Sequence, residues 1–104
     1  MPEWVKIGET GAWPPEPGQV KVIMPRDERI ALCNVDGEFF AIDDVCTHDG
    51  GPLDQGDLLD DQIECPRHGA LFDVRTGKAL TLPAIFPIKT YPLKIEGNDI
   101  LIEL

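Results

Sequence analysis

The 104-residue sequence has no long apolar run, few basic residues and only two histidines. No apolar run approaches the roughly 18 residues of a membrane-spanning helix, so we expect no membrane span. The first residues, Met1-Pro2-Glu3-Trp4, lack the basic and apolar regions of a secretory signal peptide. The sequence therefore predicts a soluble, cytoplasmic protein.

Basic residues are scarcest in the middle of the sequence. Nine Lys and Arg stand against nineteen Asp and Glu, which gives a net charge of −10. Ten of the acids and no Lys or Arg lie between Ile30 and Pro66. This charge repels nucleic acid and anionic membrane surfaces, so neither is expected as a partner. An acidic run of this kind is usually a solvated face.

Ten glycines and ten prolines leave little room for long helices, because both residues are costly in helix interiors. The apolar segments are short, and Asp36-Gly37 between two of them is typical of a β-hairpin turn. We predict one antiparallel all-β domain over residues 1–104, with a loop-rich insertion at about residues 43–72. Strands are expected at residues 4–7, 20–24, 30–35, 38–42, 58–59, 62–65, 69–74, 91–95 and 99–103.

The sequence has three cysteines, and an odd number cannot all pair with one another. This argues against a disulfide framework and favours metal ligation. Cys46 is followed by His48 and Cys65 by His68, so the pattern is C-x-H, sixteen residues, then C-x-x-H. Thiolate and imidazole together bind zinc, copper and iron–sulfur centres. The third cysteine, Cys33, lies in an apolar strand and is expected to be a buried core residue.

Two kinds of centre fit four such ligands. Structural zinc sites usually pair cysteine with cysteine and histidine with histidine at short spacings. Here each loop holds one cysteine and one histidine, an arrangement that suits a Rieske [2Fe–2S] cluster, in which two cysteines hold one iron and two histidines the other. A non-redox zinc protein with an interaction role stays open as the less favoured alternative.

The two motifs, C-T-H-D-G-G-P-L at 46–53 and C-P-R-H-G-A-L-F-D at 65–73, resemble the ligand loops of the Rieske family. The resemblance extends over nearly the whole chain and is strongest to the stand-alone ferredoxins of bacterial multicomponent oxygenases. It implies the Rieske fold, in which antiparallel, sandwich-like sheets carry a small cluster-binding subdomain. It also implies one cluster per chain, with Cys46 and Cys65 on the inner iron, His48 and His68 on the outer iron, and Pro83 as a shield against solvent.

Departures from the respiratory Rieske proteins have consequences of their own. The positions of their extra disulfide are Gly51 and Arg67 here, so this bridge cannot form. Their Ser and Tyr hydroxyls, which donate to cluster sulfur, are replaced by Ala70 and Phe72. Fewer donors and nearby carboxylates disfavour the reduced cluster, which predicts a potential near the low end of the roughly −150 to +300 mV Rieske range. Whether Arg67 contacts a partner protein or tunes the electrostatic field at the cluster stays open.

One redox centre without a substrate site predicts an electron carrier rather than an enzyme. An oxygenase would need two further histidines for a mononuclear iron site, and the sequence has no G-x-G-x-x-G fingerprint for a nicotinamide or flavin cofactor. The resemblance implies a flavin-dependent ferredoxin reductase as electron donor and a terminal oxygenase as acceptor, with the acidic stretch steering transient docking. A small Rieske subunit of an NAD(P)H-dependent nitrite reductase is the alternative within the same family.

Overall fold

The structure is a computed structural model that describes residues 3–11, 15–47, 50–67, 69–82 and 84–104. These residues form β-strands, turns and one short 3-10 helix, and contain no α-helix. The all-β prediction is therefore confirmed. No helix in the described part of the chain has the length and apolar character to cross a membrane.

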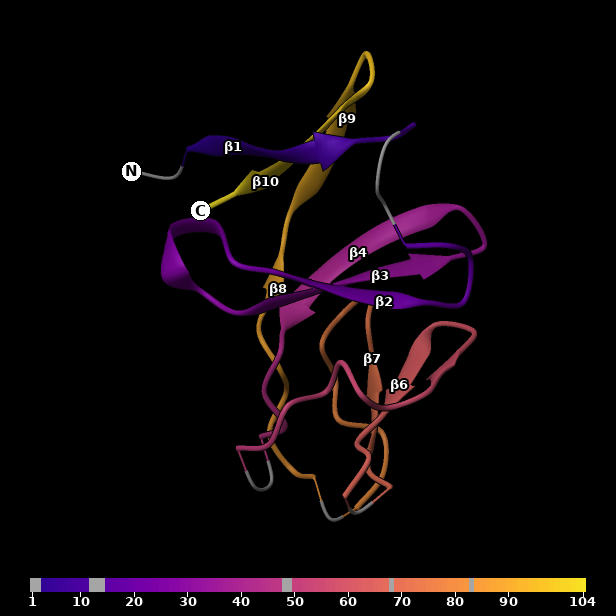
Figure 1. Cartoon of the computed structure of the whole chain (residues 1–104). Helices are drawn as coiled ribbons and strands as arrows, with labels where there is room; N and C mark the ends of the chain where they lie inside the picture. Colours follow the sequence, from indigo (N-terminus) through magenta and orange to yellow (C-terminus); the bar gives the residue numbers. More distant parts are fainter. Residues whose placement is uncertain (1–2, 12–14, 48–49, 68, 83) are drawn as a thin grey trace.

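In the described residues, ten strands form three antiparallel sheets (Figure 1). The first sheet has the order β1-β10-β9 and the second has the order β2-β3-β4-β8, while β5-β6-β7 form the third. The bounds are β1 Trp4–Glu9, β2 Val20–Ile23, η1 Pro25–Asp27, β3 Ile30–Val35, β4 Glu38–Asp43, β5 Leu58–Leu59, β6 Gln62–Glu64, β7 Leu71–Asp73, β8 Thr90–Tyr91, β9 Leu93–Glu96 and β10 Asp99–Glu103.

The β3–β4 hairpin forms where the sequence predicts it. Val35 pairs with Glu38, and the two turn residues between them have positive φ, 52° at Asp36 and 92° at Gly37. Such a two-residue turn matches the right-handed twist of the strands that it joins. This hairpin leads directly into the first candidate ligand loop, which begins where β4 ends.

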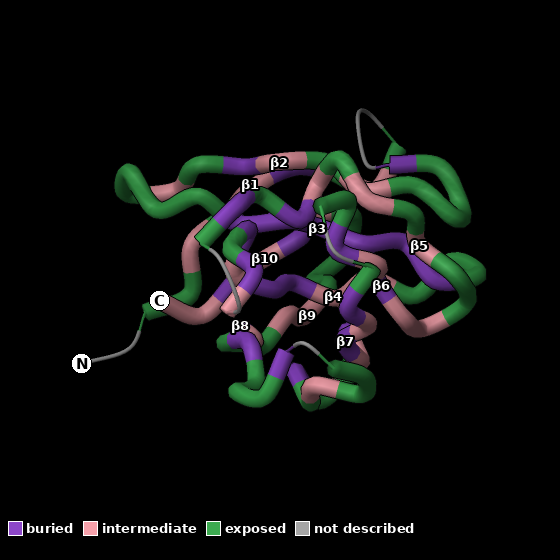
Figure 2. The backbone as a smooth tube through the Cα atoms, turned by 90° about the horizontal axis from the view of Figure 1, so that it is seen from below, coloured by how far each residue is buried: buried purple, intermediate pink, exposed green. Residues whose placement is uncertain are grey.

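The second sheet is the middle layer of the molecule. All six residues of β3 are buried, because both faces of the strand are covered. On one face, Ile30 packs with Ile102 and other apolar residues of the first sheet. On the other face, Cys33 packs with the third sheet and the loops around it. Seen from below, the buried strands of this layer lie in the middle of the molecule (Figure 2).

The predicted strand at 91–95 is divided in two, because Pro92 has no N–H for a ladder hydrogen bond. Tyr91, before it, pairs with Ala41 of β4, and Leu93, after it, pairs with Ile102 of β10. The chain thus crosses from the second sheet to the first at this proline. The predicted strand at 69–74 begins only at Leu71, because the two residues before it belong to a loop.

Candidate metal centre

The loop after β4 holds Cys46 in a tight turn. The Cys46 N–H donates to the Gly51 carbonyl at 2.7 Å, and the Gly50 N–H donates back to the Cys46 carbonyl at 2.8 Å. Gly50 has φ +76°, a left-handed conformation that glycine adopts at little cost. These two bonds fold the chain back directly after the cysteine.

The loop between β6 and β7 repeats this arrangement around Cys65. The Cys65 N–H donates to the Ala70 carbonyl at 2.7 Å, and the Gly69 N–H donates to the Cys65 carbonyl at 2.9 Å. Gly69 has φ +73°. The two loops therefore share one hydrogen-bond pattern, nineteen residues apart in the sequence.

Both cysteines point into the same buried cluster. Cys46 is fully buried and Cys65 is 1% exposed. Both belong to the apolar core between the second and third sheets, together with Leu53 and Phe72. Neither is in a disulfide. Each of the two apolar residues follows its cysteine by seven positions, so an overlay of the two motifs on their cysteines would have revealed the repeated loop from sequence.

Two cysteines outside any disulfide, which two like-folded loops bring to one core, fit the cysteine ligands of a single iron. His48, His68 and Pro83 lie outside the described residues. Within the described part of the chain, to which the two histidines do not belong, no three or more Cys, Asp and Glu side chains are grouped as a metal site.

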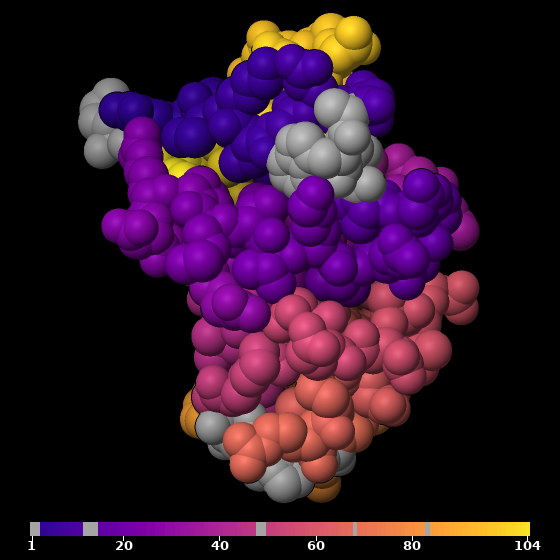
Figure 3. All heavy atoms as spheres, viewed as in Figure 1, coloured from indigo at the N-terminus to yellow at the C-terminus, as the bar shows by residue number. Residues whose placement is uncertain are grey.

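The segment after β7 completes this end of the molecule, at the bottom of Figures 1 and 3. It is tied to both loops, since Thr47 Oγ1 donates to the Phe86 carbonyl at 2.7 Å and the Leu71 N–H donates to Thr81 Oγ1 at 2.9 Å. The stretch 79–88 carries no charged residue. Four of its described large apolar side chains are exposed: Leu80 by 39%, Leu82 by 80%, Ile85 by 72% and Phe86 by 68%.

The fold brings arginines from outside the acidic stretch against four of its ten acids. Arg29 pairs with Asp44 and Asp54 at 2.5 and 3.3 Å. Arg75 pairs with Glu38 and Asp61 at 3.3 and 3.4 Å. These acids are thus partly neutralised in the folded chain, although the stretch between Ile30 and Pro66 contains no Lys or Arg.

Cys33 has no part in the candidate centre. It is fully buried on β3, as the sequence predicts. Burial, with the nearby charge of Asp44, raises the pKa of its thiol to about 12. The thiol therefore stays protonated at neutral pH, whereas a metal ligand or nucleophile must be a thiolate.

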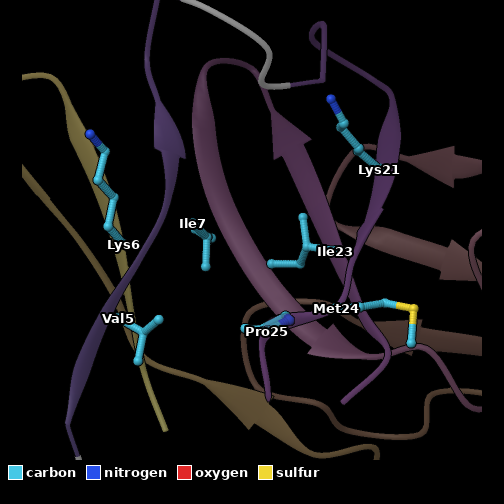
Figure 4. A pocket seen from close by; sticks show the side chains of 7 residues that line it. All are labelled: Val5, Lys6, Ile7, Lys21, Ile23, Met24 and Pro25. Atoms are coloured by element: carbon cyan, nitrogen blue, oxygen red, sulfur yellow. The ribbon is translucent and has the colours of Figure 1, made fainter. Parts of the chain in front are cut away.

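A groove of about 510 Å³ lies away from the two loops, where β1 and β2 face each other (Figure 4). Ile7 and Ile23 point toward one another across it, and Met24 lies at its end. The groove opens into the apolar cluster between the first and second sheets, to which Ile23 and Ile102 belong. Its lining contains neither cysteine nor histidine. It therefore has no ligand for the metal centre.

The comparisons with known proteins agree with the two-loop site. Residues 3–92 match the model of the Rieske [2Fe-2S] domain. The ferredoxin component of biphenyl 2,3-dioxygenase from Rhodococcus jostii (strain RHA1) is 48% identical over 88 residues, which are 85% of this chain and 82% of that protein.

Two solved structures are similar over almost the whole chain. The Sphingomonas yanoikuyae B1 ferredoxin has a TM-score of 0.88 and 34% identity, and covers 98% of this chain and 99% of its own. A chain in the complex of reduced oxygenase and oxidized ferredoxin of carbazole 1,9a-dioxygenase has a TM-score of 0.86 and 28% identity, with 95% and 91% covered. The cofactor is therefore a Rieske-type cluster and not structural zinc, and this chain belongs to the Rieske [2Fe-2S] family.

Proposed function

We propose that this chain is a one-electron carrier ferredoxin that takes electrons from a flavin-dependent ferredoxin reductase and passes them to a terminal oxygenase. The observation that carries the proposal is the two-loop thiol site beside the uncharged, apolar segment 79–88 of a small β-protein. The relative from Rhodococcus is named as a ferredoxin component of a dioxygenase, and the carbazole dioxygenase structure pairs a ferredoxin with its oxygenase. We further propose a single cytoplasmic domain over residues 1–104, with the cluster-binding subdomain at about 43–72.

Cys46 and Cys65 would hold one iron of the cluster as thiolates, and His48 and His68 the other through ring nitrogens. Serine in place of either cysteine should abolish the red-brown colour and the visible spectrum of the purified protein. The matched control is Cys33→Ser, which removes a thiol of the same core and should keep the spectrum. Alanine at His48 or His68 should also abolish it. A variant of any of the four that retains the wild-type spectrum would remove that residue from the ligand set.

When bound, the cluster supplies a single centre that accepts and donates one electron. The chain offers few hydroxyl donors to it: Ala70 and Phe72 are buried and have none, and the Thr47 hydroxyl donates to the Phe86 carbonyl. Fewer donors to the sulfurs disfavour the reduced state. We expect voltammetry to place the midpoint potential near the low end of the family range. A midpoint well above zero at neutral pH would contradict this.

The exposed apolar side chains beside the loops suit a small, transient docking surface. A charge at Leu82 or Phe86 should slow electron transfer to an oxygenase, because docking would bury that charge without a partner. Ile95→Lys is the matched control, since Ile95 is also exposed, by 51%, but lies on β9. Equal slowing by Ile95→Lys and Phe86→Lys would place the docking surface elsewhere.

The direct test is stopped-flow transfer from the dithionite-reduced protein to the oxidised oxygenase of a biphenyl dioxygenase, read from the visible spectra. We expect one electron per chain to be delivered. If the acids steer docking, the second-order rate should fall as salt is added. No transfer, combined with copurification in a stable complex with a sirohaem reductase, would favour the nitrite reductase subunit instead.

A further inference from the structure

The two ligand loops differ in how their bases are closed. The second loop leaves β6 and enters β7, and Glu64 pairs with Leu71 directly outside the loop. Backbone hydrogen bonds of the sheet therefore hold the two ends of this loop together. No side chain is needed to close it.

The first loop has no such ladder. β4 ends at Asp43, and the next strand, β5, begins only at Leu58. The Asp44 side chain takes the place of the ladder: its Oδ1 accepts the backbone N–H groups of Leu53 and Asp54, at 2.8 and 2.7 Å. One carboxylate thus joins the residue two before Cys46 to the residues at the far end of the loop.

Arg29 holds this carboxylate from outside. Its Nε donates to Asp44 Oδ2 at 2.5 Å, and its Nη2 donates to Asp54 Oδ1 at 3.3 Å. The Asp44 N–H in turn donates to the Arg29 carbonyl at 3.1 Å. The Asp44 side chain is fully buried and Arg29 is half exposed. A buried carboxylate is retained only where hydrogen bonds and an opposite charge satisfy it, and here both are supplied.

We propose that Arg29 and Asp44 are positioning residues of the metal centre, which clamp the first loop and thereby hold Cys46 in the geometry that binds the cluster. The inference rests on the proposed ligation by Cys46. Arg29 acts through Asp44, and Asp44 acts through the loop that it closes. Outer partners of this kind typically affect metal affinity by about 10–100-fold.

The test compares Arg29→Gln with Arg75→Gln. Arg75 is a matched control because it also bridges two carboxylates, those of Glu38 and Asp61, and is similarly exposed. Neither of its partners lies in a ligand loop. The readouts are the rate of cluster loss to an iron chelator, the EPR spectrum of the reduced protein, and the thermal midpoint of the apoprotein.

We expect Arg29→Gln to lose the cluster about ten-fold or more faster than the wild type and to shift or broaden the EPR signal. Arg75→Gln should change the rate less than about two-fold and leave the signal unchanged, because its partners lie outside the first-loop clamp. Equal effects of the two variants, or a wild-type rate in Arg29→Gln, would overturn the proposal.

Two further arms separate the possible failures. If Arg29→Gln does not fold, Arg29→Lys is compared with Arg75→Lys by the same rate and spectrum. Lysine keeps the charge but replaces the two-pronged guanidinium by a single ammonium group. Faster loss in the first alone supports the clamp, and equal rates overturn it. A wild-type protein that shows no Rieske spectrum would contradict the proposed function, whereas a normal wild type beside an unaffected Arg29 variant contradicts only the clamp.

Discussion

The loops at Cys46 and Cys65 have the same backbone turn, but they are embedded in the fold by different means. The second loop is the connection of a β-hairpin, and the pairing of Glu64 with Leu71 closes its base. The first loop follows the last residue of β4, and a buried carboxylate, that of Asp44, closes its base. A loop closed by backbone tolerates many side chains, whereas a loop closed by one side chain depends on it. The first loop should therefore be the more sensitive to substitution.

The largest effect is expected where the segment after the first loop meets the entrance to the second. A Cβ at Gly56, after the first loop, would lie 1.7 Å from the Glu64 carbonyl oxygen, at the entrance to the second loop. Because that neighbour is backbone, it cannot turn aside. We expect Gly56→Ala to destabilise the apoprotein by about 3 kcal/mol or more, measured by chemical denaturation.

Gly11→Ala is the control for this variant, since a Cβ at Gly11 meets no atom within 4 Å. It should leave stability almost unchanged. A Gly56→Ala protein as stable as the Gly11→Ala protein would mean that Gly56 does not lie against the Glu64 backbone in solution.

A second prediction compares the residues at the entrances of the two loops. Asp44→Ala would leave the Leu53 and Asp54 N–H groups without their acceptor, at a cost of about 2 kcal/mol. Glu64→Ala, directly before Cys65, should change stability by less than about 0.5 kcal/mol, because the ladder beside it is made by backbone atoms. Both values come from denaturation of the apoprotein, and equal losses would refute the difference between the loops.

The sequence pointed to both ligand loops, but not to the carboxylate that closes the first. The cysteines, the β3–β4 hairpin and the buried Cys33 all follow from short local patterns. Asp44 looks in the sequence like any of ten acids, and its partner Arg29 lies fifteen residues earlier. Nothing local distinguishes a buried carboxylate from a solvated one, because burial depends on which distant segments pack around it. The division at Pro92 differs, because a proline inside a predicted strand is itself a local signal of a break in the ladder.

A third prediction tests the likeness of the loops rather than their difference. Gly50 and Gly69 have nearly the same positive φ, and a Cβ at either meets no atom of the described residues within 4 Å. Alanine should therefore cost only the backbone strain of the left-handed conformation, about 1 kcal/mol at each site. Denaturation of Gly50→Ala and Gly69→Ala should give equal losses. A clearly larger loss at one site would show that the two turns are not equivalent in solution.

The smallest effects are expected where each loop is tied to the apolar segment 79–88. A threonine hydroxyl takes part in each contact: Thr47 donates to the Phe86 carbonyl, and Thr81 accepts from the Leu71 N–H. The Leu80 N–H also donates to the Leu71 carbonyl, at 2.8 Å. Valine has nearly the same shape without the hydroxyl, and because both bonds are exposed, Thr47→Val and Thr81→Val should each cost about 0.5 kcal/mol.

Hydrogen exchange gives the sharper readout for these two variants, because it reports local opening that global stability hides. The Leu71 N–H should exchange faster in Thr81→Val and stay unchanged in Thr47→Val, since only the first loses its acceptor. Faster exchange at Leu71 in both variants would mean that the segment opens as a unit and that one threonine holds it against both loops. In that case the two loops would be coupled through the apolar segment 79–88 as well as through the contact at Gly56. The difference in how the two loops are closed would then affect local stability less than the segment that contacts both.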